Sequence, residues 1–269
     1  MKYTFIGDIH SAADDLAVLL RAPSLQGSRL IFLGDYIDGR SSRKGTEQTA
    51  AIDPLAVLDI IMARVNQHGD VALLGNHDDF WLQTANGDDL SYQTWRLNGG
   101  ANTWRHLGIH SSHPIVVADA LRQAPLARYT KFLAQLPLTW STDDLLAVHA
   151  GLNWAYPLNQ QVRDDLLWIR DDYYYGPGKT WHRNLANKII VTGHTPVQTI
   201  SDDGYGFIKM QADAADLPRY LIDAGSRSGA ENGGIFALTL AETGEELAKS
   251  WVVNQQLFDG SKPLRNQTD

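Results

Sequence analysis

Polar residues that could bind metal ions follow five apolar runs in this 269-residue sequence. The five segments are Gly-Asp-Ile-His at 7–10, Gly-Asp-Tyr-Ile-Asp at 34–38, Gly-Asn-His-Asp at 75–78, His-Ala-Gly at 149–151 and Gly-His-Thr at 193–195. Together they offer six candidate ligands: Asp8, His10, Asp35, Asn76, His149 and His194. This set of oxygen and imidazole groups is large enough for two divalent ions. Clustered pairs of such ions promote the attack of water on phosphate esters. The ordered series, and no single segment, carries this prediction.

Each segment also has an ordinary structural interpretation when it is taken alone. Asp8 and His10 would point the same way in an extended segment and could reach one ion, but they could equally be a loop Asp and a surface His. The pairs Gly34-Asp35 and Asp38-Gly39 are typical turn formers. Asparagine or aspartate before a helix often acts as its N-terminal cap, which would account for residues 76–78.

The elements that must position these residues alternate along the first half of the chain. Apolar runs at 3–6, 30–33 and 71–74 predict strands, and the sequence predicts helices at 12–20 and from Asp53-Pro54 onward. Short strands that are apolar throughout and separated by helices are typical of a parallel sheet covered on both faces. Ligands of such sheets gather beyond the carboxyl ends of the strands, where the first three segments lie.

The second half of the chain predicts a second sheet. Residues 79–140 are interpreted as a mainly helical insert whose tryptophans, Trp81, Trp95 and Trp104, belong to the core. Further strands are predicted at 145–148, 189–192, 220–222, 235–240 and 247–253, of which the last two form an antiparallel hairpin. We therefore expect an α/β fold with two sheets packed face to face and helices outside. Residues 1–258 would form one domain, because the segments of both halves must meet at one site, and 259–269 a polar tail.

Composition excludes several classes of protein. With no cysteine, the chain has neither disulfides nor thiolate zinc sites. It carries 23 basic and 31 acidic residues, so its net charge is 23 − 31 = −8, which disfavours general nucleic-acid binding. The first residues lack the apolar region of a signal peptide, and no apolar run approaches the roughly 20 residues that span a bilayer. We predict a cytoplasmic protein without a membrane partner, and no oligomeric state is indicated.

The five segments resemble the calcineurin-like metallophosphoesterases of the phosphoprotein phosphatase type. The pattern of that family is Gly-Asp-x-His, Gly-Asp-x-x-Asp-Arg-Gly, Gly-Asn-His-Glu, His-Gly-Gly or similar, and Gly-His-Thr. The likeness extends over about residues 3–240. Three further stretches, Asn98-Gly99-Gly100, 132–137 and Leu167-Trp168-Ile169-Arg170, resemble the bacterial branch of the family, which includes diadenosine tetraphosphatase-like members.

The resemblance implies a four-layer metallophosphoesterase fold with two divalent metal ions. The first ion would be held by Asp8, His10 and Asp35. The second ion would be held by Asp35, Asn76, His149 and His194. A water or hydroxide between the ions would attack phosphorus. Mn²⁺ is the first choice for a ligand set of oxygen and nitrogen without sulfur, and Fe, Zn or Co are alternatives.

The resemblance also implies the groups that move the proton and bind the phosphate. His77 would protonate the leaving oxygen while Asp38 orients its imidazole, and two arginines would bind phosphate oxygens. This chain departs from the pattern at Asp38-Gly39-Arg40, where the family has Asp-Arg-Gly, so Arg40 would have to reach phosphate from one residue later. Arg170 is the better candidate, although it could be a surface arginine. The replacement of the family's Glu by Asp78 is expected to matter little.

The sequence leaves the substrate open. A phosphoserine or phosphothreonine protein phosphatase is the first interpretation, and a hydrolase of dinucleoside polyphosphates or other small phosphate compounds is the second. A base-stacking aromatic side chain beside the phosphate site would favour the nucleotide substrate. Residues 173–175, which are three tyrosines, could provide one but more often form a packed loop. A non-catalytic metal-binding interaction module is the remote alternative.

Overall fold

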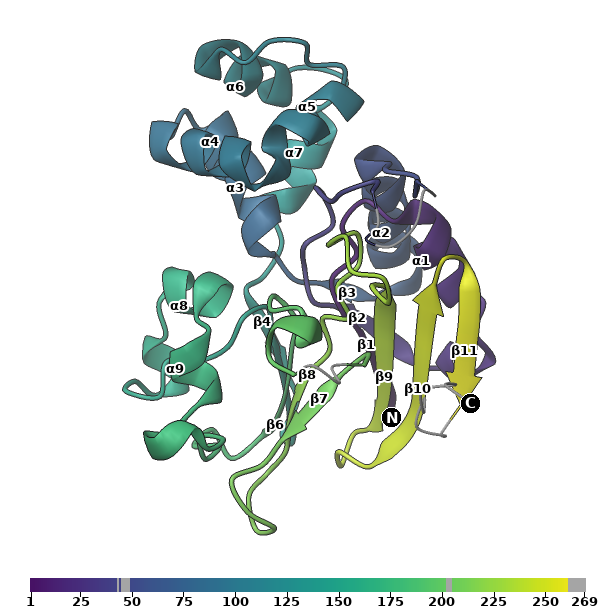
Figure 1. The fold of residues 1–269 in the computed structure, drawn as a ribbon, viewed down its shortest axis with the longest axis vertical. Helices are drawn as coiled ribbons and strands as arrows, with labels where there is room; N and C mark the ends of the chain where they lie inside the picture. The colour runs from purple at the N-terminus through teal and green to yellow at the C-terminus, as the bar shows by residue number, and fades with distance from the viewer. Residues whose placement is uncertain (43, 45–48, 202–204, 261–269) are drawn as a thin grey trace.

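The computed structural model describes residues 1–42, 44, 49–201 and 205–260 of the chain. Two mixed β-sheets form its centre (Figure 1). The first sheet has the spatial order β11 (Gln256–Gly260), β10 (Glu246–Val253), β9 (Ile235–Ala241), β1 (Lys2–Ile6), β2 (Arg29–Phe32) and β3 (Val71–Ala72). The second has the order β4 (Thr139–Ser141), β5 (Leu145–Val148), β6 (Ile189–Thr192), β8 (Arg219–Leu221) and β7 (Ile208–Met210).

Parallel strands make up the middle of both sheets. Strands β1, β2 and β3 run parallel, as predicted, and so do β5, β6 and β8. Strands β9 and β10 form the predicted antiparallel hairpin, which joins the first sheet by pairing β9 against β1. The carboxyl ends of the parallel strands in each sheet therefore meet at one edge, where loops can bring polar side chains together.

The two sheets pack against each other through alternate residues of their strands. Tyr3 and Phe5 of β1 and Leu145 and Ala147 of β5 share one buried cluster between the sheets. Leu146, the residue between the last two, faces the opposite side of its sheet and belongs to a different cluster. Because side chains alternate along a strand, a strand that is apolar throughout is buried on both faces, as the sequence predicted.

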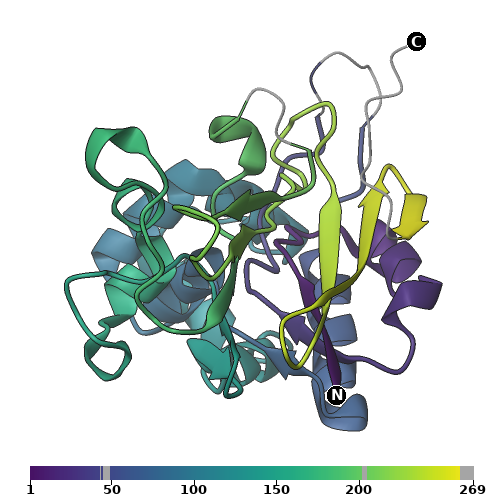
Figure 2. The ribbon, with the colours of Figure 1, turned by 90° about the horizontal axis from the view of Figure 1, so that it is seen from below.

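Helices cover the outer faces of the sandwich (Figure 2). On the first sheet lie α1 (Ala13–Leu19) and α2 (Pro54–His68), whose apolar side chains share a core with β1 and β2. Helix α2 begins as predicted, because the side chain of Asp53 accepts the backbone N–H of Ala56. Helices α8 (Arg163–Trp168) and α9 (Asp171–Tyr174) cover the second sheet. The four layers confirm the predicted α/β sandwich.

The segment between β3 and β4 is built mainly of helices, which gather at one end of the molecule (Figure 1). They are α3 (Asn76–Ala85), α4 (Asp89–Trp95), a π-helical turn (Arg96–Gly100), α5 (Ala101–His106), α6 (Pro114–Arg122) and α7 (Ala127–Leu133). Trp81, Trp95 and Trp104 are buried there, as expected. The last helix ends at Leu133, and Thr139–Ser141 forms the edge strand β4, where the predicted insert still extended to residue 140.

Three short strands, β4, β7 and β11, were not predicted. β11 reaches Gly260 and so includes the first two residues of the expected polar tail, whereas 261–269 lie outside the described residues. β11 is mostly polar and pairs with β10 at the edge of its sheet. Such an edge strand carries no apolar alternation, because only its backbone is needed for pairing. Among the described residues, no helix is both long and apolar enough to cross a membrane.

Candidate metal centre

The six candidate ligands lie together beyond the carboxyl ends of five parallel strands. β1, β2 and β3 of the first sheet are followed by Asp8, His10, Asp35 and Asn76, and β5 and β6 of the second by His149 and His194. The backbone N–H of His194 donates to both oxygens of Asp8 at 3.1 Å, although 186 positions separate the two residues. These hydrogen bonds link the loop after β1 of the first sheet to the loop after β6 of the second within the site.

The first group of possible ligands contains Asp8, His10 and Asp35, with one ligand atom of each within 4.8 Å of the others. His10 Nε2 lies 3.7 Å from Asp35 Oδ2 and 4.0 Å from Asp8 Oδ2. The segment is not extended as expected, because His10 has a left-handed φ of 50°. His10 is therefore brought to Asp8 by a turn, and its backbone N–H donates to the Asp35 carbonyl oxygen at 2.9 Å.

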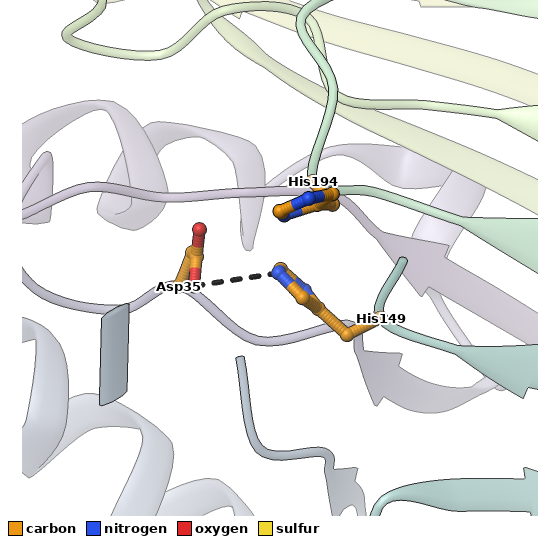
Figure 3. A group of neighbouring side chains, drawn as sticks. All are labelled: Asp35, His149 and His194. Carbon is orange, nitrogen blue, oxygen red and sulfur yellow. Dashed lines mark ion pairs between the residues drawn. The ribbon is translucent and has the colours of Figure 1, made fainter. Parts of the chain in front are cut away.

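The second group contains Asp35, His149 and His194, which converge from three different loops (Figure 3). His149 Nε2 lies 3.5 Å from Asp35 Oδ1 and 2.8 Å from Asn76 Oδ1. His194 Nδ1 lies 2.7 Å from the same Asn76 oxygen. Asp35 thus presents Oδ2 to the first group and Oδ1 to the second, which is the arrangement of a carboxylate shared by two ions.

The hydrogen bonds of two imidazoles show that these residues fit a cation. His149 Nδ1 lies 2.9 Å from the carbonyl oxygen of Leu33, and His10 Nδ1 lies 3.0 Å from that of Ile37. A carbonyl oxygen can only accept, so each ring carries a proton on Nδ1, and in its neutral form it presents the lone pair of Nε2 to the site. In each group a nitrogen lone pair thus faces carboxylate or amide oxygens, and a divalent ion would satisfy all of them.

Carboxylates and imidazoles crowd the buried site and shift the pKa values of one another. Burial, the Asp223 carboxylate and the Asp35 carboxylate raise the pKa of Asp8 well above its usual range. Burial acts against the ionised form of Asp35 as well, but the positive charge that neighbouring imidazoles, His149 foremost, carry when protonated holds the pKa of Asp35 below its usual value. Burial also lowers the pKa of His149, which keeps its ring neutral. Crowded carboxylates beside neutral imidazoles favour the binding of cations.

His77 and Asp38 form a hydrogen-bonded pair beside Asp35. His77 Nδ1 lies 2.6 Å from Asp38 Oδ2, and the backbone N–H of His77 donates to Asp35 Oδ1 at 3.0 Å. Burial opposes the charged imidazole, but the carboxylates of Asp35 and Asp38 outweigh it and raise the pKa of His77 to about 9. The ring is therefore protonated at neutral pH and can donate a proton.

Asp78 has a larger part in the site than the sequence suggested. Its carboxylate accepts the backbone N–H groups of Asp35 at 2.8 Å, Tyr36 at 3.1 Å and Gly75 at 3.1 Å. A Cβ atom on Gly75 would lie 2.2 Å from the Asp35 nitrogen, so only glycine permits this approach of the two loops. The start of helix α3 thus fixes the backbone of the shared ligand.

Asp223 is a buried carboxylate of the site that sequence analysis missed. It follows β8 as Asp8 follows β1, so the apolar run at 220–222 was the signal that could have found it. Its Oδ1 accepts the backbone N–H of Gly225 at 2.8 Å, and Oδ2 has no hydrogen-bond partner among the described residues. Burial raises the pKa of Asp223 to about 6.

The displaced arginine of the second motif lines a pocket next to His10 and His77. Gly39 has a φ of 115°, and a Cβ atom there would lie 2.7 Å from Arg227 Cβ and from the carbonyl oxygen of His10. No side chain fits at position 39, and the exposed Arg40 follows it. Arg227 also lines the pocket, but its guanidinium is committed to Asp14 and Asp15.

Arg170 and Trp168 border the second group of ligands. Arg170 donates to Thr195 Oγ1 at 2.5 Å and to the carbonyl oxygen of His194 at 3.4 Å. The indole of Trp168 is 38% exposed, and its ring centroid lies 5.9 Å from that of His194. Tyr173 and Tyr174, by contrast, are buried, which agrees with the packed interpretation. Trp168 therefore offers the site an exposed aromatic side chain.

Known proteins share this fold. A family model described as calcineurin-like phosphoesterase matches residues 1–224. The crystal structure of a diadenosine tetraphosphatase candidate has a TM-score of 0.57 at 20% identity and covers 97% of this chain and 95% of its own. A metallophosphoesterase from Sphaerobacter thermophilus and a protein serine/threonine phosphatase from Saccharomyces cerevisiae each have a TM-score of 0.47 at 15% identity. They cover 98% and 99% of this chain and 90% and 82% of their own. A search among curated proteins finds no match.

The match over residues 1–224 shows that the chain belongs to the calcineurin-like phosphoesterase family. The chain is thus a metal-dependent phosphoester hydrolase that acts on phosphate-ester substrates, with a candidate metal-binding cluster in place. This confirms the resemblance and the class of enzyme predicted from the five segments. The alternative of a non-catalytic module does not agree with this membership.

Proposed function

We propose that the protein hydrolyses phosphate monoesters with two divalent ions, and that phosphoserine and phosphothreonine side chains of proteins are its substrates. The observation that supports this most is the position of Asp35. One carboxylate oxygen faces each ligand group, while the backbone N–H of the neighbouring His77 donates to the same carboxylate. Both proposed ion sites and the proposed proton donor, His77, therefore adjoin Asp35.

The proposed ligands are the two sets that the structure brings together. Asp8, His10 and Asp35 would hold one ion, and Asp35, Asn76, His149 and His194 the other. Ions there would neutralise charge on phosphate oxygens and lower the pKa of an attacking water towards ~7. Mn²⁺ is the proposed metal, because neutral nitrogen and hard oxygen ligands without sulfur suit it, with Fe, Zn and Co as alternatives.

The residues of the chain would then guide the departure of the leaving group. As water forms a new bond to phosphorus, the old P–O bond breaks and its electron pair goes to the leaving oxygen. His77 gives that oxygen the proton of Nε2, while Asp38 holds Nδ1–H and so fixes the ring. Arg170, which Thr195 and the His194 carbonyl oxygen hold beside the site, would bind the phosphate. Arg40 would do so from the pocket.

The size of the pocket favours a phosphorylated side chain. The cavity beside His10, His77 and Arg40 has a volume of about 320 Å³. This lies at the lower end of the range of roughly 300–1,000 Å³ that holds a drug-sized ligand. A phosphoserine side chain fits such a volume, whereas a molecule with two nucleosides would have to extend over the surrounding surface.

One observation favours the second candidate, a hydrolase of dinucleoside polyphosphates. The half-exposed indole of Trp168 lies beside His194, at the second ligand group. It also packs edge-on against Phe80, with 5.1 Å between the ring centroids, which holds the indole in place. A fixed aromatic face next to a phosphate site could stack a nucleobase, as in proteins that bind single-stranded nucleic acids.

A substrate panel tests both candidates. Metal-free protein is loaded with Mn²⁺ and assayed on p-nitrophenyl phosphate, a phosphoserine peptide and diadenosine tetraphosphate. We expect turnover of the first two and a loss of about 100-fold or more in His77→Asn. A preference for the dinucleotide that disappears in Trp168→Ala would establish the second candidate. Protein that turns over none of the three substrates would disprove the proposed function. The cytoplasmic location and the lack of a nucleic-acid partner stay predictions.

A further inference from the structure

The helical insert contacts the proton-transfer pair through one buried carboxylate. Asp38 is 1% exposed, and besides His77 it has two hydrogen-bond donors from the insert. Trp95 Nε1 lies 2.8 Å from Asp38 Oδ2 and 3.0 Å from Oδ1, and the hydroxyl of Thr103 donates to Oδ1. Both oxygens of Asp38 are therefore held by donors from the insert.

These donors flank a motif to which the proposed function gives no role. Trp95 is the last residue of α4 and Thr103 lies in α5, and Asn98-Gly99-Gly100 forms part of the π-helical turn between them. The chain kinks in this turn, where Gly99 has a φ of 111°, and both side chains reach the same carboxylate, 57 and 65 positions from Asp38. The motif thus connects the two helices whose side chains, Trp95 and Thr103, hold Asp38.

Packing alone does not account for these two hydrogen bonds. The ring of Trp95 belongs to an aromatic core with Trp81 and Trp104, at centroid distances of 6.3 and 5.4 Å. A phenylalanine could fill much of that space without an N–H group. The carboxylate, however, accepts an indole N–H, a hydroxyl and an imidazole N–H, which together fix the plane in which its oxygens lie. Hydrogen bonds to a charged carboxylate are short and directional.

We propose that Trp95 and Thr103 are positioning residues for the proton-transfer step: they fix the Asp38 carboxylate, and Asp38 fixes the His77 ring against the leaving oxygen. This inference rests on the proposed function, because it concerns the protonation of a leaving group. It assigns the helical insert a part in the reaction. Loosening of Asp38 would let the ring turn, and the proton would then be poorly aligned when the P–O bond breaks.

The dependence of the rate on the leaving group tests this proposal. A dinitrophenolate leaves readily without a proton, whereas phenolate, with a conjugate-acid pKa of about 10, needs one. In the Mn²⁺-loaded enzyme, Trp95→Phe and Thr103→Val should lower kcat for phenyl phosphate about 10-fold and leave that for 2,4-dinitrophenyl phosphate within about twofold. Thr103→Ser, which keeps the hydroxyl that donates to Asp38, should retain the wild-type kcat for both esters.

Trp81→Phe is the matched control. Trp81 is equally buried, and its Nε1 donates to Thr130 Oγ1 at 2.7 Å, so the control loses a comparable hydrogen bond that does not involve Asp38. Trp81→Phe should leave the ratio of kcat for phenyl phosphate to kcat for 2,4-dinitrophenyl phosphate unchanged. If Trp95→Phe and Thr103→Val slow both esters equally, or slow neither, the proposal is wrong. A wild-type enzyme that hydrolyses neither ester would disprove the proposed function, and this inference with it.

A measurement without turnover gives a second test. The indole N–H proton of Trp95, identified in NMR spectra by its loss in Trp95→Phe, should resonate downfield of ordinary indole protons because it bonds to a carboxylate. Asp38→Asn should move this signal upfield and leave that of Trp81 in place. An unchanged Trp95 signal in Asp38→Asn would show that the hydrogen bond is absent and would overturn the proposal.

Discussion

The carboxylate of Asp78 accepts the backbone N–H of Asp35 at 2.8 Å, so the start of helix α3 holds the loop that carries the shared ligand. Asp78 is fully buried, and its loss would leave three backbone N–H groups without their acceptor. We expect Asp78→Ala to lower the free energy of unfolding by about 3 kcal/mol. Urea denaturation measures this change, and metal affinity should fall as well because Asp35 is loosened.

The neighbouring acid provides the control for this prediction. Asp79 is half-buried and pairs at 2.6 Å with Arg163, whose side chain is 41% exposed. We expect Asp79→Ala to cost less than about 1 kcal/mol, because it removes an ion pair that solvent reaches on the arginine side and leaves no backbone N–H group of the described residues without its acceptor. Equal destabilisation by the two substitutions would contradict the role given to Asp78.

Metal binding should raise the thermal stability of the protein. The buried carboxylates of Asp8 and Asp35 repel each other, and a cation relieves this repulsion in the folded state alone. Mn²⁺ at 100 times its dissociation constant should add about 2.7 kcal/mol, and a chelator should remove that gain. The gain should be lost in Asp35→Asn. It should persist in Asp70→Asn, which removes a buried acid paired with Arg64 outside the site.

Removal of Arg170 should weaken binding of phosphate. Its guanidinium is held beside His194, so we expect Arg170→Ala to raise KM for p-nitrophenyl phosphate, and the inhibition constant of inorganic phosphate, about 10-fold. Arg163→Ala, which removes a surface arginine of α8, should leave both constants unchanged. A normal phosphate inhibition constant in Arg170→Ala would show that this arginine does not bind phosphate.

The carboxylate of Glu246 should make stability depend on pH in the acid range. Partial burial opposes its charge, but hydrogen bonds from Lys209, Lys249 and Tyr220 lower the pKa of Glu246 from 4.5 to about 2. A lowered carboxyl pKa stabilises the fold above pH 4.5, and this stabilisation is lost as pH falls from 4.5 through about 2.

The size of this effect is modest because Glu246 is partly exposed. Glu246→Gln should cost on the order of 1 kcal/mol in the free energy of unfolding at pH 7, and much less near pH 2. Glu245→Gln, at the exposed neighbouring position, should show no such dependence on pH. Denaturation curves of both variants at the two pH values decide between these outcomes; a pH-independent cost for Glu246→Gln would refute the prediction.

Much of the fold could be predicted because its signals are local. Apolar runs such as 3–6 and 145–148 correspond to buried strands, and the Asp53-Pro54 pair begins a helix as its residue types require. The edge strand β11 gave no such signal, because it is held by backbone pairing to β10 and leaves polar side chains exposed. Patterns of apolar residues report burial, and edge strands have little of it.

The candidate site divides in the same way. Asp8, Asp35 and the other proposed ligands could be predicted because each follows an apolar run. Ligands of a parallel sheet bind beyond the carboxyl ends of its strands. Trp95 was assigned to the core alone, since its sequence neighbours give no sign that its N–H meets Asp38, 57 positions away. The turn at His10 was missed for a similar reason: its left-handed φ is set by the Asp35 carbonyl oxygen that accepts its N–H.

Residue type and strand order, which are local properties of the chain, indicated which groups could bind metal, and the likeness to the family added the pair that would transfer a proton. The tertiary structure decided how these groups are held. Contacts between distant segments let Asp78 hold the loop of Asp35, and they let Trp95 and Thr103 hold Asp38. The same kind of contact leaves room only for glycine at position 39, before Arg40. Such contacts arise only when packing of the two sheets and the insert brings those segments within hydrogen-bond distance.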